Sequence, residues 1–337
     1  MEFSIFSILG QYLYNSVIRD LSKSRPALPP IPHIGKKMTF FTRLKWRCVN
    51  YILKFSDPIV NIWEGKTKLR MRLSHTNIFC YALFPMYDKA LPRISARIQE
   101  IDGRLVMIDV GANIGDTAAL VSETVSGASI LCIEGNEKVL DFLNYNIKFI
   151  KNNNITIEPR FCTDSPSNIG FSVDMQYGTA KLVKNEMSNI QGDTLDNIVN
   201  RSPVFKKTNL LKIDTDGFEI IVFNGAKKLI NQIQPIIYFE FNPYDYEKAG
   251  QSSFYLFDLL ISAGYKRALF YTNCGIPLGI YNITNKEEMQ ELIDTLAEEE
   301  NGKIIYYYYD ILLVPENKFD IYHKILQDEL AFQKGNK

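Results

Sequence analysis

The sequence lacks the cysteine pattern of a disulfide framework or a zinc site. Its five cysteines are odd in number, scattered over 337 residues and never spaced as CxxC, so neither kind of site is indicated. No run approaches 18 consecutive apolar residues, the length that spans a bilayer. Glu2 stands where a secretory signal carries positive charge, and no cleavage site follows it. We therefore expect a cytoplasmic protein without a transmembrane segment.

The charges balance overall but are unevenly distributed. The chain has 38 basic and 38 acidic residues. Residues 1–100 contain 16 Lys and Arg against 6 Asp and Glu, about +10, and the remainder contains 22 against 32, about −10. Such a basic segment favours an anionic partner, for example a membrane leaflet, a phosphate-linked lipid or an acidic glycan. A basic surface that is merely solvated is the alternative, and we expect no nucleic-acid partner.

The pattern of the chain changes near residue 101. Before it, residues 21–37 predict a linker, residues 38–55 a basic amphipathic helix, and residues 62–73 a half-buried strand. After it, short apolar strands alternate with amphipathic helices, which is typical of βαβ units around a parallel sheet. We expect strands at 105–111, 129–135, 155–163, 209–215, 235–241, 265–272 and 304–314, helices near 116–126, 137–151, 218–231, 253–263 and 286–299, and an inserted hairpin at 169–185. The predicted division is a basic N-terminal region at 1–100 with helices and a short strand pair, an α/β domain at 101–316 and a closing helix at 317–337.

A glycine turn follows the first strand of the α/β domain, in the sequence IDVGANIGD at 108–116. Glycine lets the backbone turn tightly and approach a ligand closely. The spacing is D-x-G-x-x-x-G and lacks the G-x-G-x-x-G that brings a helix N-terminus onto a pyrophosphate. This difference favours S-adenosylmethionine (SAM), which has no phosphate, over NAD. Asp109 is suited to the methionine ammonium, and Asn113 and Asp116 offer side-chain hydrogen bonds beside Gly111 and Gly115. A helix-capping role is the alternative for Asp116.

Two acidic residues follow the next strands. Glu134 ends the second strand, 19 residues after Gly115, where doubly wound folds place an acid that accepts hydrogen bonds from the ribose hydroxyls. Its alternative is an exposed strand-end glutamate. Asp164 follows the third strand, beside the expected position of the adenine ring, and we expect it either to accept the exocyclic amine or simply to cap a loop.

Three stretches together resemble the FkbM methyltransferase family, namely IDVGANIGDTA at 108–118, GDTLDNIV at 192–199 and LLKIDTDGFEIIVFNGAKKLI at 210–230. The resemblance covers roughly residues 101–275. It implies a doubly wound, Rossmann-like class I methyltransferase with a seven-stranded, mostly parallel sheet of order 3-2-1-4-5-7-6, and SAM as the cofactor. The family's usual Glu-Pro is Glu134-Gly135 here, and its usual Asp-Val-Glu-Gly is Asp-Thr-Asp-Gly at 214–217. Two further stretches, at 239–243 and 268–275, are similar to members associated with surface polysaccharides.

Methyl transfer to a hydroxyl needs alignment of the acceptor and removal of its proton. Lys212 and Asp214 are two apart on an apolar strand and so project from one face, either as a structural ion pair or as proton-transfer groups. Glu240, at the end of the fifth strand, is a second candidate base. Asp216 is interpreted as a helix N-cap. The histidines lie outside the α/β core, although His75 remains a candidate to reach over from the N-terminal region.

The sequence therefore predicts a SAM-dependent O-methyltransferase with no required metal. Its expected acceptor is a hydroxyl, that of a sugar in a bacterial surface polysaccharide or glycan precursor on a lipid-linked or nucleotide-linked carrier. Membrane contact, if any, would be peripheral. An NAD(P)-dependent oxidoreductase, which shares the glycine turn and the strand-end acid, is the first alternative. A non-catalytic module that keeps the fold is the second.

Overall fold

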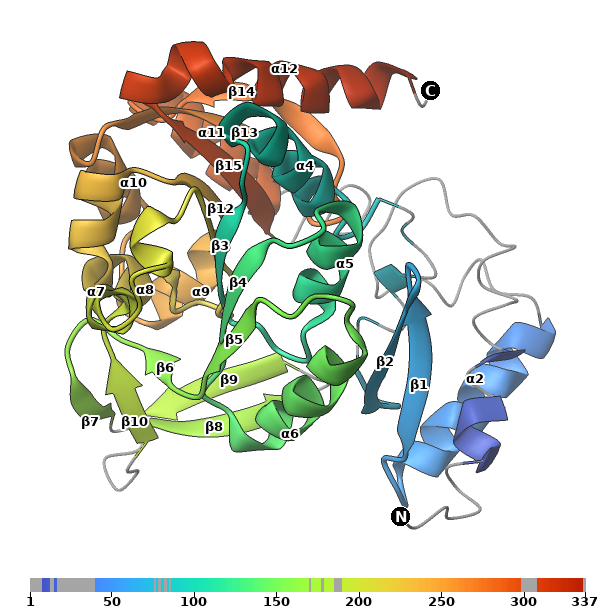
Figure 1. Cartoon of the computed structure of the whole chain (residues 1–337). Helices are drawn as coiled ribbons and strands as arrows, with labels where there is room; N and C mark the ends of the chain where they lie inside the picture. Colours follow the sequence, from blue (N-terminus) through green and yellow to red (C-terminus); the bar gives the residue numbers. More distant parts are fainter. Residues whose placement is uncertain are drawn as a thin grey trace.

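The computed structural model describes residues 8–12, 15–16, 40–75, 77, 80–81, 84, 86–169, 171–176, 179–184, 190–297 and 308–335. Its centre is an eight-stranded sheet of order β14-β13-β15-β12-β11-β3-β4-β5 (Figure 1). The strands are β3 (Val106–Val110), β4 (Ser129–Ile133), β5 (Ile155–Glu158), β11 (Leu210–Ile213), β12 (Ile236–Phe241), β13 (Tyr265–Thr272), β14 (Pro277–Asn282) and β15 (Tyr309–Pro315).

The strands from β5 to β12 are parallel, and β15 runs antiparallel between β12 and β13. The predicted count of seven strands is wrong, because β14 adds an eighth at the edge, antiparallel to β13. Its sequence, PLGIYN, contains Pro and Gly, which are depleted in strands and are tolerated at a sheet edge. The predicted third strand also ends early, at Glu158, and Phe161–Cys162 form a separate short strand, β6.

Helices cover both faces of the sheet, each over its own apolar core. One core contains residues of α2 (Phe40–Leu53), α4 (Ala90–Asp102), α5 (Asp116–Thr124), α6 (Glu137–Asn146) and α12 (Phe319–Gly335). The other contains residues of α7 (Leu195–Asn200), α8 (Glu219–Gly225), α9 (Pro243–Lys248), α10 (Ser253–Ser262) and α11 (Lys286–Ala297). Short helical turns lie at Ile147–Phe149, Phe205–Lys207, Leu229–Ile233 and Glu316–Lys318. Since strand residues alternate between faces, each buried strand serves both cores.

The N-terminal region packs directly against the α/β domain. Residues 62–73, predicted as one strand, are instead the end of β1 (Ile59–Glu64) and all of β2 (Thr67–Arg72), an antiparallel hairpin. Gly65, with φ +59°, turns the chain between them. Glu123 of α5 fixes this turn, accepting hydrogen bonds from the Lys66 N–H at 2.7 Å and the Thr67 hydroxyl at 2.6 Å. The predicted domain division at residue 100 falls inside α4.

An insertion follows β5. It comprises a small sheet of β6, β10 (Ile190–Asp193) and β7 (Ser167–Ile169), and a hairpin of β8 (Phe171–Gln176) and β9 (Thr179–Lys184). The hairpin was predicted at 169–185, and its expected turn at 177–178 lies outside the described residues, as do the predicted linker at 21–37 and the start of the predicted strand at 304–314. None of the described helices is long and apolar enough to cross a membrane.

Candidate active site

Charged side chains gather where the central parallel strands end. Register places Asp109 of β3 beside Lys212 of β11, and Lys212 beside Tyr238 of β12. Two residues further along, Glu240 of β12 stands opposite Asp310 of β15. Residues two apart on a strand share a face, so these side chains lie in two adjacent rows on the side of the sheet that α4 and α5 cover.

Lys212 forms an ion pair on each side. Its Nζ lies 3.2 Å from Asp109 Oδ1 and 3.2 Å from Asp214 Oδ2, so Lys212 and Asp214 do form an ion pair, while a proton-transfer role for Asp214 stays a prediction. Asp109 is fully buried and Asp214 is 43% exposed. Burial would lower the pKa of the Lys212 ammonium, but the surrounding carboxylates, Asp109 first, raise it well above its usual value. Lys212 therefore stays protonated at neutral pH and cannot accept a proton.

Lys212 is surrounded by more carboxylates than it can neutralise. Burial raises the pKa of Asp109, and Lys212 offsets part of that rise. Asp88 reaches the cluster from the N-terminal region, and its pKa is raised well above the usual range by burial and by neighbouring carboxylates. Burial and the charge of Asp214 likewise raise the pKa of Glu240 well above its usual range and that of Asp310 to about 7.

The described residues contain no group of three or more His, Cys, Asp and Glu side chains arranged to hold a metal ion. Among the described residues, Lys212 is the ammonium that pairs with this carboxylate cluster. A pocket edge of this composition attracts a cationic ligand and repels an anionic one.

The glycine turn between β3 and α5 adopts the conformation that its sequence suggests. Gly111 has φ +80°, and a Cβ there would lie 1.8 Å from the carbonyl oxygen of Asp214. Packing against β11 by itself therefore requires glycine at this position. Gly115 has φ +87° and precedes α5, and a Cβ there would lie 2.8 Å from Leu143. Asn113 has φ +46°, a conformation that asparagine tolerates better than most residues.

Glu134 holds the glycine turn from the end of β4. It is buried, and its carboxylate accepts hydrogen bonds from the backbone N–H of Asn113 at 3.0 Å and of Asn136 at 2.8 Å. The predicted alternative of an exposed glutamate is therefore wrong. The Gly135 N–H also bonds this carboxylate, which leaves one of its about four lone-pair sites for a ribose hydroxyl. The unusual Gly135 is explained by Phe161, whose ring would lie 2.2 Å from a Cβ at position 135.

The N-terminal region covers the start of α5. Asp116 is the first residue of α5, and its Oδ2 accepts hydrogen bonds from the Asn77 side chain at 2.7 Å and the Tyr81 hydroxyl at 2.6 Å. His75 is buried, with its Nε2 3.4 Å from Asn113 Oδ1. Burial lowers the pKa of this histidine, so the ring is neutral. The N-terminal region is thereby joined to the glycine turn itself.

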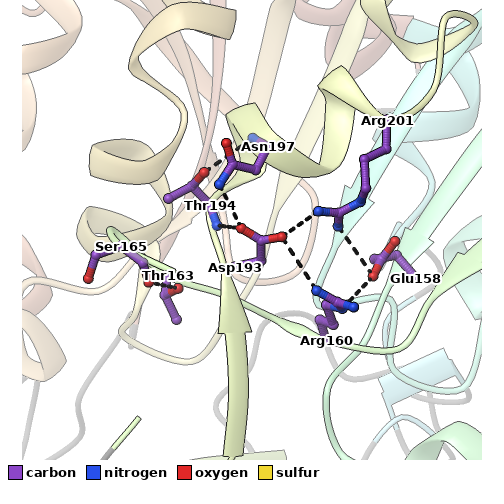
Figure 2. A network of polar contacts seen from close by, with 8 residues as sticks. All are labelled: Glu158, Arg160, Thr163, Ser165, Asp193, Thr194, Asn197 and Arg201. Atoms are coloured by element: carbon purple, nitrogen blue, oxygen red, sulfur yellow. Dashed lines mark hydrogen bonds and ion pairs between the residues drawn. The ribbon is translucent and has the colours of Figure 1, made fainter. Parts of the chain in front are cut away.

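A polar network anchors the chain after β5 (Figure 2). Asp193, the first aspartate of the GDTLDNIV stretch, lies between Arg201, at 2.5 Å, and Arg160, at 3.5 Å. Glu158 pairs with Arg160 at 3.0 Å. Burial by itself would raise the pKa of Asp193. Hydrogen bonds, chiefly from the Arg201 side chain, outweigh burial and lower this pKa below its usual value. This network ties the end of β5 to β10 and α7, and so fixes the loop that carries Asp164.

The sequence of this central part of the chain matches the model of a known protein family. Residues 109–267 match the family model of the methyltransferase FkbM domain. The chain carries an FkbM methyltransferase domain. Enzymes of this kind take the methyl group from SAM, which is the cofactor of this domain. No curated protein sequence matches the chain significantly.

Solved structures of methyltransferases are similar to this chain in fold. The FkbM methyltransferase of Methylobacillus flagellatus KT matches at 14% identity and TM-score 0.34, over 75% of this chain and 54% of that one. The magnesium protoporphyrin IX methyltransferase of Synechocystis PCC 6803 with bound SAM matches at 11% identity and TM-score 0.37, over 68% and 79%. A SAM-dependent methyltransferase of Agrobacterium tumefaciens matches at 7% identity and TM-score 0.41, over 78% and 71%. The predicted Rossmann-like methyltransferase fold is supported by the family match and by the mostly parallel sheet with helices on both faces.

The FkbM domain can accommodate SAM at the end of β3. Neither oxygen of the buried Asp109 carboxylate accepts a well-formed hydrogen bond from a described residue. A buried carboxylate without such a donor is costly, and the methionine ammonium would supply one. Glu134 stands at the end of the adjacent strand, at the place where the ribose is expected.

The remaining predicted site residues fall into different positions. Asp164 is exposed and accepts a hydrogen bond from the Ser165 hydroxyl at 3.0 Å, so its contact with adenine stays a prediction. Asp216 was interpreted as the N-cap of α8, which is wrong. It has φ +54° and lies in the preceding turn, and Phe218 occupies the N-cap position. Buried Glu219 instead accepts hydrogen bonds from that turn, beginning with the Thr215 N–H at 2.8 Å.

Sequence reasoning missed Asp88, Tyr81 and Asp310. The sequence did carry a signal for Asp310, because it is the single charged residue in the apolar run of the last strand. Asp88 and Tyr81 carried none, since only tertiary packing brings them to the glycine turn and the cluster.

Proposed function

We propose that the FkbM domain methylates a hydroxyl group, and that the acceptor is a sugar of a surface polysaccharide or glycan precursor. The observation that carries the proposal is the excess of buried carboxylates around the single ammonium of Lys212. This excess favours a sulfonium cofactor and leaves carboxylates available to take a proton. The glycan part rests on the resemblance of residues 239–243 and 268–275.

The cofactor residues take the following roles in this proposal. Asp109 receives the methionine ammonium, and Glu134 accepts hydrogen bonds from the ribose hydroxyls. Gly111 and Gly115 keep the turn narrow. Asn113 and Asp116 lie beside the methionine part, where Asp116 is held by its contacts with the N-terminal region. Asp164 is the partner of the adenine amine.

The proton of the acceptor hydroxyl goes to the carboxylate pair of Glu240 and Asp310. When bound, SAM supplies a methyl group activated by its sulfonium. One bond forms between the acceptor oxygen and the methyl carbon, and the methyl–sulfur bond breaks with its electron pair going to sulfur. Asp310, with a pKa of about 7, is half protonated near neutral pH and is thus well suited to general base catalysis. Lys212 holds Asp109 and Asp214 in place, so that Asp214 can orient the acceptor.

The carrier of the sugar is proposed to be anionic, either a lipid-linked or a nucleotide-linked phosphate. Support comes from the basic N-terminal region, with 16 basic against 6 acidic residues. The oxidoreductase alternative finds no support at this site, because the pyrophosphate of a nicotinamide cofactor would be repelled by the carboxylates.

Calorimetry with SAM and S-adenosylhomocysteine tests the cofactor roles without knowledge of the acceptor. We expect micromolar binding to the wild type, strong weakening in Glu134→Ala, and retained binding in Asp214→Asn. Methyl transfer from labelled SAM to a panel of glycan acceptors then tests the acceptor class. No SAM binding by the folded protein, together with bound-NADH fluorescence, would favour the oxidoreductase. No binding of either cofactor would favour the non-catalytic module.

A further inference from the structure

Exposed apolar side chains are concentrated in the N-terminal part of the chain, before the α/β domain. Among the described residues, sixteen large apolar side chains are exposed, and eight of them lie between residues 8 and 63. They are Ile8, Leu9, Tyr12, Leu44, Tyr51, Phe55, Ile59 and Trp63. Surface aromatic residues gathered in this way indicate an interaction site.

Helix α2 has apolar residues on two faces. Val49 and Ile52 are buried in the core beneath it. An adjacent face carries an exposed stripe of Leu44, Cys48, Tyr51 and Phe55 at helical spacing, which extends to just beyond the end of the helix. Tyr51 and Phe55 are 63% and 67% exposed, and their rings meet edge to face at 5.0 Å. The fold uses the first face and leaves the stripe in contact with solvent.

The hairpin continues this surface. Figure 1 shows β1 and β2 next to α2 at the edge of the molecule, and both elements contribute to one core cluster. The outward residues of β1 include Ile59 and Trp63, the latter 68% exposed. Their cross-strand partners are Arg72 and Lys68 respectively. Apolar and basic side chains therefore alternate across the exposed face of the hairpin.

The same surface carries unneutralised positive charge. Arg47, Lys54, Lys66, Lys68 and Arg72 are exposed, and none forms an ion pair with another described residue.

The acidic side chains nearby are Asp57, which accepts hydrogen bonds from the backbone and hydroxyl of Ser74, Glu64, which is buried and paired with Lys89, and Glu123, which accepts hydrogen bonds from the Lys66 N–H and the Thr67 hydroxyl. None of them forms an ion pair with the five basic side chains. The surface formed by residues 44–72 is therefore both aromatic and cationic.

We propose that the surface formed by residues 44–72 docks the protein onto an anionic lipid bilayer. Trp, Tyr and Phe side chains insert at the level of the headgroups, and basic side chains are attracted by the negative surface potential. The combination fits a bilayer better than a second copy of this chain, because two such cationic faces would repel each other. This inference is independent of the acceptor proposed above.

Vesicle flotation of the full chain tests the docking surface. The probes are vesicles of phosphatidylcholine alone and of equimolar phosphatidylcholine and phosphatidylglycerol. An apolar variant combines Tyr51→Ser, Phe55→Ser and Trp63→Ser, and a charge variant combines Lys54→Glu and Lys68→Glu. We expect the wild type to float with the anionic vesicles only. The charge variant should bind at least twentyfold more weakly, from roughly fivefold per basic side chain removed.

The apolar variant should lose roughly tenfold or more, because three rings no longer leave water. One matched control replaces exposed apolar residues elsewhere, Val204→Ser with Ile321→Ser, and another reverses exposed lysines, Lys206→Glu with Lys207→Glu. Both controls should float like the wild type.

Three results would overturn the proposal: equal flotation with neutral vesicles, variants that float like the wild type, or controls that lose as much as the variants. A wild-type dimer in sedimentation that the apolar variant abolishes, without flotation, would assign the surface to a second copy. SAM calorimetry on the same variants separates the two proposals, because the docking variants should keep the heat of SAM binding. A wild type that floats with anionic vesicles but does not bind SAM would refute only the cofactor roles.

Discussion

Replacing Lys212 by methionine removes the positive charge that pairs with the fully buried carboxylate of Asp109 among the described residues. Methionine has nearly the length of lysine and fits an apolar strand. Asp214, 43% exposed, can be solvated by water after the change. Asp109 has no exposed surface, so water cannot solvate its carboxylate after the change. Removal of one partner of a buried ion pair costs about 3–5 kcal/mol, and this figure applies to Asp109.

A double substitution isolates the pair. In Asp109→Asn with Lys212→Met both charges are gone and the shapes are nearly kept, so the free energy of unfolding should return to within about 1–2 kcal/mol of the wild type. Asp109→Asn alone leaves Lys212 paired with Asp214 and should cost less than Lys212→Met. The coupling energy from the cycle is then about 2–3 kcal/mol.

Thermal unfolding provides the assay. The entropy of unfolding is about 2.1 cal/mol per kelvin per residue. For a chain of 337 residues, each loss of about 0.7 kcal/mol in the free energy of unfolding therefore lowers Tm by about 1 °C. Lys212→Met should lower Tm by about 4–7 °C. The effect depends on pH. Loss of Lys212 raises the already raised pKa of Asp109, so the folded variant holds a proton that the unfolded chain releases above about pH 4. The stability gap to the wild type should therefore widen as pH rises from 5 to 8.

A Lys212→Met variant that melts within a degree of the wild type at pH 8, with no dependence of the gap on pH, would refute the claim that Lys212 neutralises Asp109. Excess SAM adds a second readout. If its ammonium meets Asp109, SAM should raise the Tm of Lys212→Met more than that of the double variant.

Four further predictions follow from the same geometry. Glu134→Ala should weaken SAM binding in calorimetry by roughly 10–100-fold, from the loss of hydrogen bonds to a charged acceptor, whereas Glu134→Gln should lose less. Tyr81→Phe should lower Tm by about 1–3 °C through its lost bond to Asp116, and an unchanged Tm would contradict that bond. Asp310→Asn should abolish the rise of methyl transfer through pH 7, because its pKa is about 7 and a base acts when deprotonated. SAM binding at pH 7 should release protons, because a bound cation lowers the raised pKa values of Glu240 and Asp310. The release is measured in calorimetry as a heat of binding that changes with the ionisation enthalpy of the buffer.

Local pattern was sufficient to predict the elements that the active site needs. The strands that end at Asp109, Glu134 and Glu240 are short apolar runs between turn residues, and such runs are buried parallel strands. The i, i+2 spacing of Lys212 and Asp214 placed both on one face, where the structure has them paired. These inferences needed only the backbone period and the cost of burying an unpaired lysine.

Contacts between distant segments could not be predicted in this way. Asp88 and Tyr81 reach the site from a region that carries no family signal, and their positions depend on how the β1–β2 hairpin packs against α5. The sequence indicated a short strand pair in this region, but the alternation of Lys and Arg begins only after Gly65, so neither the start of β1 nor the turn was predicted. The edge strand β14 was missed since Pro277 and Gly279 argue against a strand everywhere except at an edge.

The raised pKa values of Asp88, Asp109, Glu240 and Asp310 describe a site that is electrostatically unfavourable on its own. A raised pKa of an acid means that folding opposes its ionisation, so stability falls between the pKa of the unfolded chain and that of the folded one. For Asp310 this range extends from about pH 4 to about 7. Apolar residues of similar size would avoid this cost. Positive charge that enters the cluster offsets this cost, and in the proposed function a sulfonium with an adjacent ammonium brings that charge to the ends of β3 and β11. The electrostatic feature that opposes folding would then favour binding of the methyl donor.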